Sequence, residues 1–290
     1  MILDELRNRT TVVDIKNHPY IVSIQKEMIH SCCGTIISSS WIMTTSRCLT
    51  QPGSDVQLVD TTKIAVVAGQ SQLGLGKMQL RRAKNLFLHN RFVKKMLLND
   101  IGMINLYEPF ELNDYVNVVL LASSISKPYK FFSSCYVISW TVYRKDFLSF
   151  DKLRAEDEKT KKLFKVPELQ QIDLPTITYE ECCDRIEAKD FITRNQICTE
   201  YGTLKNISCP ADAGSPLICG ERQYGIFSWG IGCEDDDYPG VFTKVSSFRK
   251  WINNIEMDPN VYIFRNKGVL GIRLKHSIII LVEMFIFIMK

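Results

Sequence analysis

The stretch Cys209-Pro210-Ala211-Asp212-Ala213-Gly214-Ser215-Pro216-Leu217 decides the fold, because it carries a distinctive motif and leads directly into a series of short apolar segments. Segments of this kind, rich in branched and aromatic residues, are separated by polar or glycine-containing stretches. They are Tyr20 to Ile24, Thr35 to Ile37, Ile64 to Val67, Tyr136 to Ser139, Pro216 to Cys219, Tyr224 to Trp229 and Gly240 to Val245. The pattern predicts an all-β domain, closed over Ser246 to Ile255 by a short amphipathic helix.

The composition is that of an ordinary globular protein. The chain has 290 residues, 46% of them hydrophobic, and can bury a sizeable core in one large domain or two small ones. Its 36 basic and 32 acidic residues leave a net charge of +4. Charge therefore gives no reason to expect nucleic acid as a partner.

The chain has ten cysteines, more than a cytosolic protein usually carries. None lies in a CxxC or CxxH pattern, so we predict disulfides, no metal site and no cofactor. Disulfides require an oxidising compartment, which predicts a secreted or extracellular surface protein, yet Met1 to Arg7 lacks the features of a secretory signal. Either the chain begins downstream of a true leader, which we favour, or export occurs in a way that the sequence does not reveal.

Two stretches depart from the β pattern. Arg144 to Lys165 is dominated by charged residues and predicts a long solvated loop. Ser277 to Met289 is almost wholly apolar, but thirteen residues interrupted by Glu283 are too few to span a bilayer as a helix. A GPI-attachment signal around Asn266 to Gly268 fits better. The alternatives are therefore membrane attachment through the tail, a loosely structured tail and an altered reading frame.

A set of landmarks resembles the trypsin-like (chymotrypsin-fold, S1 family) serine proteases in residues, order and spacing. They are Pro19 to Ile24, His30 to Ile37, Trp41 to Cys48, Asn99 to Gly102, Cys135 to Trp140, Leu169 to Gln171, Ile197 to Cys198, Cys209 to Leu217, Ser228 to Gly230 and Pro239 to Val245. The resemblance implies two packed antiparallel β-barrels with a short C-terminal helix, and a site in the cleft between them. It divides the chain into an irregular segment without signal or activation site (1–18), a protease-homology domain (19–255) and a tail (256–290).

The resemblance also implies four disulfides. They are Cys32 with Cys48, Cys135 with Cys219, Cys209 with Cys233, and Cys198 with either Cys182 or Cys183. This leaves one member of the 182–183 doublet and Cys33, which stands where the family usually has glycine. These spare cysteines are buried and inert, mispaired, or used between chains.

Catalysis in this family needs a hydroxyl nucleophile, an imidazole base and a carboxylate that orients the base. Asp100 matches the carboxylate, but Arg47 stands at the imidazole position and Ala213 at the nucleophile position. Arginine stays protonated at physiological pH, and a methyl group cannot attack a carbonyl. Ser215 lies near the nucleophile position, but no histidine has a motif match nearby. The resemblance therefore implies a degenerate triad, in which Arg47 and Asp100 form an ion pair.

The substrate-binding positions also depart from the family. Ala211 replaces the glycine whose amide helps to form the oxyanion hole, and alanine tolerates positive φ poorly. Ile207 stands at the base of the substrate pocket, where trypsin has the aspartate that recognises Lys or Arg. The remaining pocket positions are Ser228, Trp229, Gly230 and Gly240.

The activation features are incomplete too. Active members expose an Ile-Val-Gly-Gly terminus whose ammonium pairs with the aspartate before the nucleophile. That aspartate is Asp212, but the stretch before Pro19 contains no such tetrapeptide. Ser23, His30 and Asp212 match positions that hydrogen-bond to one another in the family's inactive precursors. We therefore expect a permanently precursor-like arrangement.

The leading hypothesis is an inactive serine protease homologue that binds a protein partner through its cleft or through Arg144 to Lys165, secreted or attached to a membrane. Glycosylation sequons at Asn8 and Asn206 matter only if the chain is secreted. The alternatives are a serine endopeptidase with residual or unconventional activity, and a decaying product without function. The intact set of expected cysteine pairs argues against decay.

Overall fold

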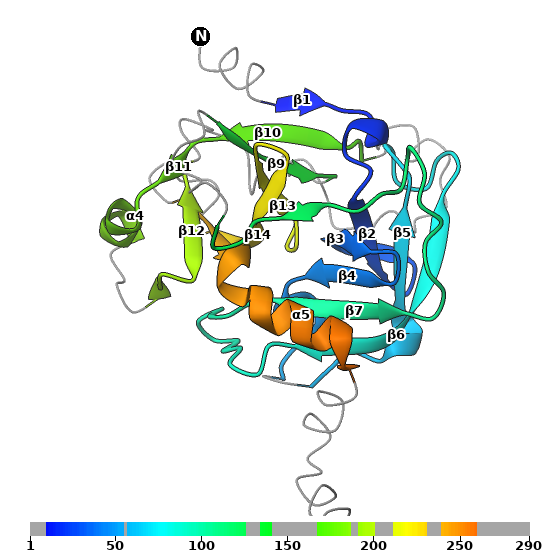
Figure 1. Cartoon of the computed structure of the whole chain (residues 1–290), viewed down its shortest axis with the longest axis horizontal. Helices are drawn as coiled ribbons and strands as arrows, with labels where there is room; N and C mark the ends of the chain where they lie inside the picture. The colour runs from blue at the N-terminus through cyan, green and yellow to red at the C-terminus, as the bar shows by residue number, and fades with distance from the viewer. Residues whose placement is uncertain are drawn as a thin grey trace, which may run out of the picture. The chain divides into compact units, whose positions relative to one another are not determined.

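The computed structural model describes residues 10–54, 57–125, 134–140, 167–186, 191–200, 211–230 and 239–259. Within residues 10–249 the strands form two sheets (Figure 1). Several sequence predictions concern positions outside the described residues: Asn8, Arg144 to Lys165, Asn206, Ile207, Cys209, Cys233 and the apolar tail.

The first sheet closes into a barrel in the order β2-β3-β4-β7-β6-β5. Its strands are β2 (Ile21–Lys26), β3 (Ile29–Ser38), β4 (Trp41–Thr44), β5 (Ile64–Ala68), β6 (Gln79–Leu88) and β7 (Gly102–Leu106). All six pairings are antiparallel. Branched side chains fill the interior, with Ile24, Ile36, Ile42, Val66 and Ile104 in one buried cluster. Closure pairs every strand on both sides and so leaves the barrel without a free edge.

The second sheet has nine strands, in the order β1-β10-β9-β13-β14-β15-β12-β11 with β8 paired to β14. They are β1 (Thr10–Val12), β8 (Leu120–Leu121), β9 (Cys135–Ser139), β10 (Gln170–Leu174), β11 (Thr176–Ile177), β12 (Gln196–Thr199), β13 (Pro216–Cys219), β14 (Arg222–Gly230) and β15 (Gly240–Lys244). Its core contains Val137, Leu174, Leu217 and the edge-to-face pair Phe227 and Phe242. The prediction of two barrel-like sheets is confirmed, and all their pairings are antiparallel except that of the two-residue strand β8 with β14.

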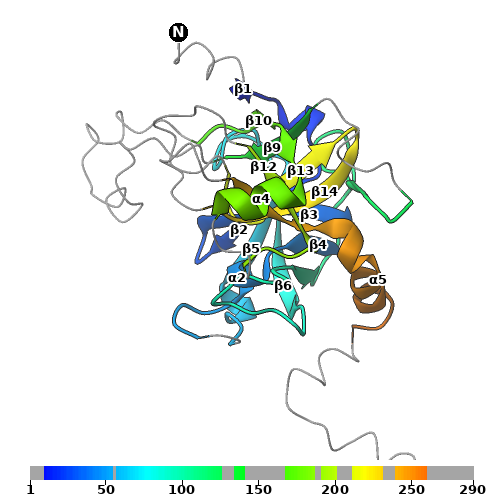
Figure 2. The same ribbon diagram turned by 90° about the vertical axis from the view of Figure 1, so that its left-hand side faces the viewer.

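The helices in the described part of the chain are few and short. Among the described residues up to Arg249 are α2 (Ser46–Leu49) and α4 (Tyr179–Ile186), with 3-10 turns η1 (Ile15–Asn17), η2 (Thr61–Lys63) and η6 (Val245–Phe248). In Figure 2, α4 lies beside β12, to which a disulfide ties it. The helix α5 (Arg249–Met257) is amphipathic and buries Trp251, Ile252 and Ile255. It confirms the predicted C-terminal helix. In the described part of the chain, every helix is too short or too polar to cross a membrane.

The N-terminal segment differs from its prediction as an irregular stretch. Residues Thr10–Val12 form β1, which pairs with β10 and extends the edge of the second sheet. Asp14 then caps η1 by accepting a hydrogen bond from the backbone N–H of Lys16 at 2.8 Å. Pairing to a sheet edge needs only main-chain hydrogen bonds, so three residues with little apolar pattern of their own could form a strand.

Three of the four expected disulfides lie among the described residues: Cys32–Cys48, Cys135–Cys219 and Cys182–Cys198. The Cys182–Cys198 disulfide shows that Cys182, and not Cys183, is the partner of Cys198. Cys33 and Cys183 are free and buried.

Thiol counting tests the fourth disulfide, between Cys209 and Cys233. Under denaturing, non-reducing conditions, we expect only the two free cysteines, Cys33 and Cys183, to react with an alkylating reagent. Mass spectrometry of the labelled peptides identifies them. Additional labelling on Cys209 and Cys233 would contradict the predicted pair, and a Cys33→Ala, Cys183→Ala variant provides the blank.

Candidate functional site

Asp100, which lies just before β7, is fully buried and is held by donors from α2 and from β14 of the second sheet. The backbone N–H of Arg47 donates to Oδ1 at 2.9 Å, and the Ser228 hydroxyl on β14 donates to Oδ2 at 2.7 Å. The side chain of Arg47 adds an ion pair, with Nε 3.8 Å from Oδ2. The predicted pair of Arg47 and Asp100 is therefore present.

Arg47 is fixed by its neighbours in α2. The Ser46 hydroxyl donates to the carbonyl of Ile101 at 2.6 Å, and Cys48 is cross-linked to Cys32 on β3. A helix of four residues has little stability of its own, so these two links set its place. The side chain of Arg47 is 33% exposed, whereas that of Asp100 is 0% exposed.

Burial governs the ionisation of this pair. It raises the pKa of Asp100 to about 6, against the opposing effects of the Arg47 charge and the hydrogen bonds from Ser228 and the backbone. Burial also lowers the pKa of Arg47, while Asp100 and Asp212 raise it. A guanidinium starts from so high a pKa that Arg47 keeps its charge at neutral pH.

Ala213 lies in a turn that rests on β3. The N–H of Ser215 donates to the carbonyl of Asp212 at 3.0 Å and closes the turn, and the N–H of Cys33 donates to the carbonyl of Ala213 at 2.8 Å. Gly214 has a φ of 88°, and a Cβ there would collide with the carbonyl oxygen of Cys33. Only glycine fits this position. The methyl group of Ala213 packs against the core of the first barrel.

Ala211 is buried in the core of the second sheet. It is not among the non-glycine residues with positive φ in the described part of the chain. Of the predicted pocket positions, Ser228, Trp229 and Gly230 lie on β14 and Gly240 on β15, where Gly230 and Gly240 are directly paired. The structure thus brings four of the five pocket positions together.

Ser23, His30 and Asp212 form one hydrogen-bonded chain across the two sheets. Ser23 Oγ lies 2.7 Å from Nδ1 of His30, and Nε2 of His30 lies 3.1 Å from Oδ2 of Asp212. Two residues that sequence analysis did not place here join them. Ser139 Oγ donates to Oδ2 of Asp212 at 2.7 Å, and the Cys33 thiol lies 3.6 Å from the same oxygen.

The signals for these two residues differ. The sequence indicates Cys33 only as a departure from the glycine that the family usually has at this position. Nothing in the sequence indicates Ser139, which β9 places beside the Asp212 turn. Burial, and secondarily the charge of Asp212, raises the pKa of the Cys33 thiol well above its ordinary value. The thiol therefore stays protonated at neutral pH.

Ser215, the alternative hydroxyl, is fully buried. Two described histidines are engaged elsewhere: His18 with the hydroxyl of Tyr20, and His89 edge-to-face with Phe248. His276 lies outside the described residues. Ser215 is therefore closed to a substrate in this conformation.

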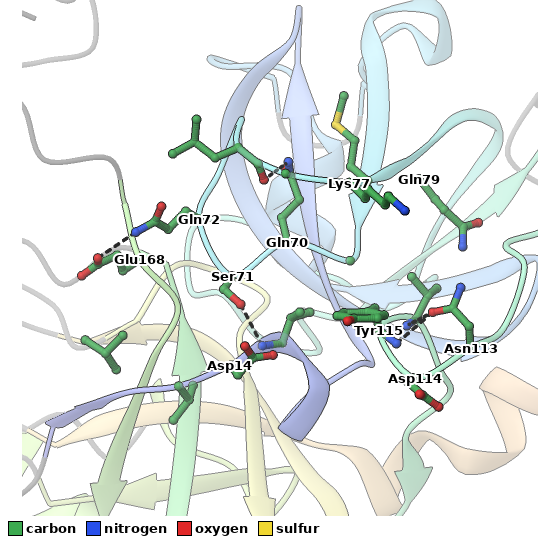
Figure 3. Close-up of a pocket in the computed structure, with 18 residues that line it drawn as sticks. Asp14, Gln70, Ser71, Gln72, Lys77, Gln79, Asn113, Asp114, Tyr115 and Glu168 are labelled. Carbon is green, nitrogen blue, oxygen red and sulfur yellow. Dashed lines mark hydrogen bonds between the residues drawn. The ribbon is translucent and has the colours of Figure 1, made fainter.

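A hollow of about 1190 Å³ lies away from these residues, between the η1 region, the loop from Gly69 to Gln79 and the turn from Asn113 to Val116 (Figure 3). Polar groups on its walls bond to one another. The N–H of Ile15 donates to Ser71 Oγ at 2.9 Å, and Gln72 donates to Glu168 at 2.8 Å. None of the site residues predicted from sequence lines it.

The pair of Arg47 and Asp100 predicts a pH-dependent loss of stability in Arg47→Gln. The raised pKa means that native Asp100 binds a proton that the unfolded chain releases, so its burial weakens folding as pH rises from about 4 to about 6. Removing the Arg47 cation should lower the free energy of unfolding by about 1–3 kcal/mol near pH 8 and by much less near pH 5. The loss at pH 8 is smaller than for a fully buried ion pair, because Arg47 is partly exposed.

Urea unfolding at both pH values measures this difference. Lys63→Gln is the matched control, because its ion pair with Glu27 lies on the surface and should matter little at either pH. An equal loss at both pH values would show that Arg47 acts through packing and not through the Asp100 charge.

Comparison with known proteins agrees with this architecture. The family model described as "Trypsin" matches residues 8–252. Trypsin of Xenopus laevis is 29% identical over 238 residues, covering 81% of this chain and 85% of the relative. Trypsin I-P1 of Gallus gallus is 30% identical over 236 residues, covering 81% of this chain and 82% of the relative. With its two barrel-like sheets and this match over most of its length, the chain belongs to the trypsin family of serine proteases.

Proposed function

We propose that this family member is catalytically inactive and serves as a binding module for a protein partner. The observation that carries the proposal is the place of Arg47, whose backbone and side chain both face the buried Asp100 carboxylate. In the family mechanism, that carboxylate orients an imidazole, which takes the proton of the nucleophile. A guanidinium that stays charged cannot take the proton.

The second missing group is the nucleophile. Ala213 offers a methyl group at the turn where the family carries serine, and loss of a nucleophile costs about a million-fold in turnover in related chemistry. Ser215 is no replacement in this conformation, because it is fully buried. Only binding and an intact oxyanion hole would then support hydrolysis, worth roughly a thousand-fold over water.

The contacts of Asp212 support the loss of this residual activity from binding and the oxyanion hole. In active members this aspartate pairs with a new N-terminal ammonium, whereas here it accepts a hydrogen bond from Ser139 and lies beside His30. Ala211, at the oxyanion-hole position, packs in a core and lacks positive φ. These features favour a permanently precursor-like arrangement, with the cleft available for binding without turnover.

The location proposed is the cell exterior, either secreted or at the surface. Three disulfides need an oxidising compartment in which to form. An inactive homologue acts by binding another protein. We expect its binding surface at the cleft or at Arg144 to Lys165.

A fluorophosphonate probe and a broad peptide library test the proposal. We expect no labelling and no cleavage by the full chain, produced with a secretory leader and checked for its disulfides. Labelling that survives removal of contaminating proteases and disappears in Ser215→Ala would overturn the proposal. An Arg47→His, Ala213→Ser double variant is the comparison. Restored labelling would assign the loss to these two side chains alone, and continued silence would assign part of it to Ala211 and Asp212.

A further inference from the structure

Three different side chains contact one carboxylate oxygen of Asp212. Nε2 of His30 lies 3.1 Å from Oδ2, the Cys33 sulfur 3.6 Å and the Ser139 hydroxyl 2.7 Å. The ligand atoms of His30, Cys33 and Asp212 all lie within 4.8 Å of one another. We propose that these three residues form a zinc site that joins β3 of the first barrel to the Asp212 turn of the second sheet.

The distances suit a tetrahedral ion. Zinc binds imidazole nitrogen and carboxylate oxygen at about 2.0–2.2 Å and thiolate sulfur at about 2.3 Å, which places neighbouring ligand atoms about 3.3–3.6 Å apart. The His30–Asp212 and Cys33–Asp212 separations are already near these values. The His30–Cys33 separation is at most 4.8 Å, so a shift of no more than about 1.2 Å closes the set around the metal.

The donor types favour zinc over other cations. One nitrogen, one sulfur and one oxygen ligand match the borderline-soft character of Zn²⁺, whereas Ca²⁺ and Mg²⁺ take oxygen ligands. The side chains are well enclosed, with Cys33 fully buried, His30 6% exposed and Asp212 13% exposed. Three protein ligands leave one tetrahedral position for water.

Neighbouring hydroxyls are placed to orient the ligands. Zinc on Nε2 of His30 requires the ring proton on Nδ1, and Ser23 Oγ, 2.7 Å away, accepts it. Ser139 fixes the carboxylate by donating to Oδ2 while accepting from the backbone N–H of Asp212 at 3.0 Å. Binding releases one proton to solvent, from the Cys33 thiol, and the two positive charges of zinc meet one thiolate and one carboxylate.

The spacing of the residues explains why sequence motifs gave no sign of a metal. His30 and Cys33 lie close together, but Asp212 is 182 residues from His30 along the chain. Arg47, Asp100 and Ala213 are not ligands, but the site shares His30 and Asp212 with the precursor-like arrangement and to that extent rests on the proposed function. Zinc titration and the fluorophosphonate probe distinguish the two proposals, because a chain that neither labels nor binds zinc contradicts the zinc site alone.

Titration of the full, disulfide-checked chain with Zn²⁺ against a chromophoric chelator tests the site. We expect a single tight site, weakened at least about 100-fold in Cys33→Gly and in His30→Gln and about 10–100-fold in Ser23→Ala. Cys183→Ala is the matched control, because it removes the other buried free thiol and should leave the affinity unchanged. Absence of binding, or equal binding by Cys33→Gly, would overturn the proposal.

Cobalt provides a spectroscopic readout of which atoms bind the metal. Co²⁺ in the natural chain should give a near-ultraviolet thiolate-to-metal absorption and the visible bands of a tetrahedral ion, both absent in Cys33→Gly. Circular dichroism of each variant without metal separates a lost ligand from a lost fold, and Cys33→Ala is the second variant if Cys33→Gly unfolds. A cobalt spectrum without the thiolate band would assign the metal to other residues and so contradict the site.

Discussion

The contact of Gly214 with the backbone of β3 is the constraint on which the rest of the site depends. Because position 214 has no Cβ, the turn from Asp212 to Ser215 approaches the carbonyl of Cys33 closely, and Cys33 in turn binds Ala213 through its N–H. The Thr44 hydroxyl donates to the same Cys33 carbonyl at 2.8 Å. This approach brings the second sheet against the first barrel, and every cross-sheet contact of Asp212 follows from it.

Two buried or half-buried carboxylates are then held in different ways. Asp100 receives a backbone N–H and a serine hydroxyl and faces a guanidinium, so its charge is balanced within the site. Asp212 has a serine hydroxyl, a histidine and a thiol around one oxygen, a set that carries no permanent positive charge. Asp212 also interacts with the charge of Arg47, and the nitrogen of His30 and the sulfur of Cys33 beside it offer a cation a mixed set of ligands.

The short apolar segments predicted an all-β domain. The family resemblance predicted two barrels and placed Arg47 beside Asp100 and Ser23 beside His30 and Asp212. Ser139 was out of reach, because its role depends on how β9 lies against a turn 73 residues away. The strand β1 was missed for a similar reason: its stability comes from pairing with β10 and not from its own pattern. The choice between Cys182 and Cys183 depended on helix geometry, which spacing along the chain does not encode.

Both cysteine doublets lie on regular elements that send neighbouring side chains in different directions. On β3, Cys32 faces the core of the first barrel, and Cys33 joins a separate cluster with Ile138 and Trp140. On α4, consecutive residues are about 100° apart, and Cys182 is the one bonded to β12. In each doublet, the secondary structure decides which of the two sulfur atoms faces its partner. Oxidative folding of this chain is thus a selection between adjacent thiols, and exchange by one residue would turn a strand or helix face away from its core.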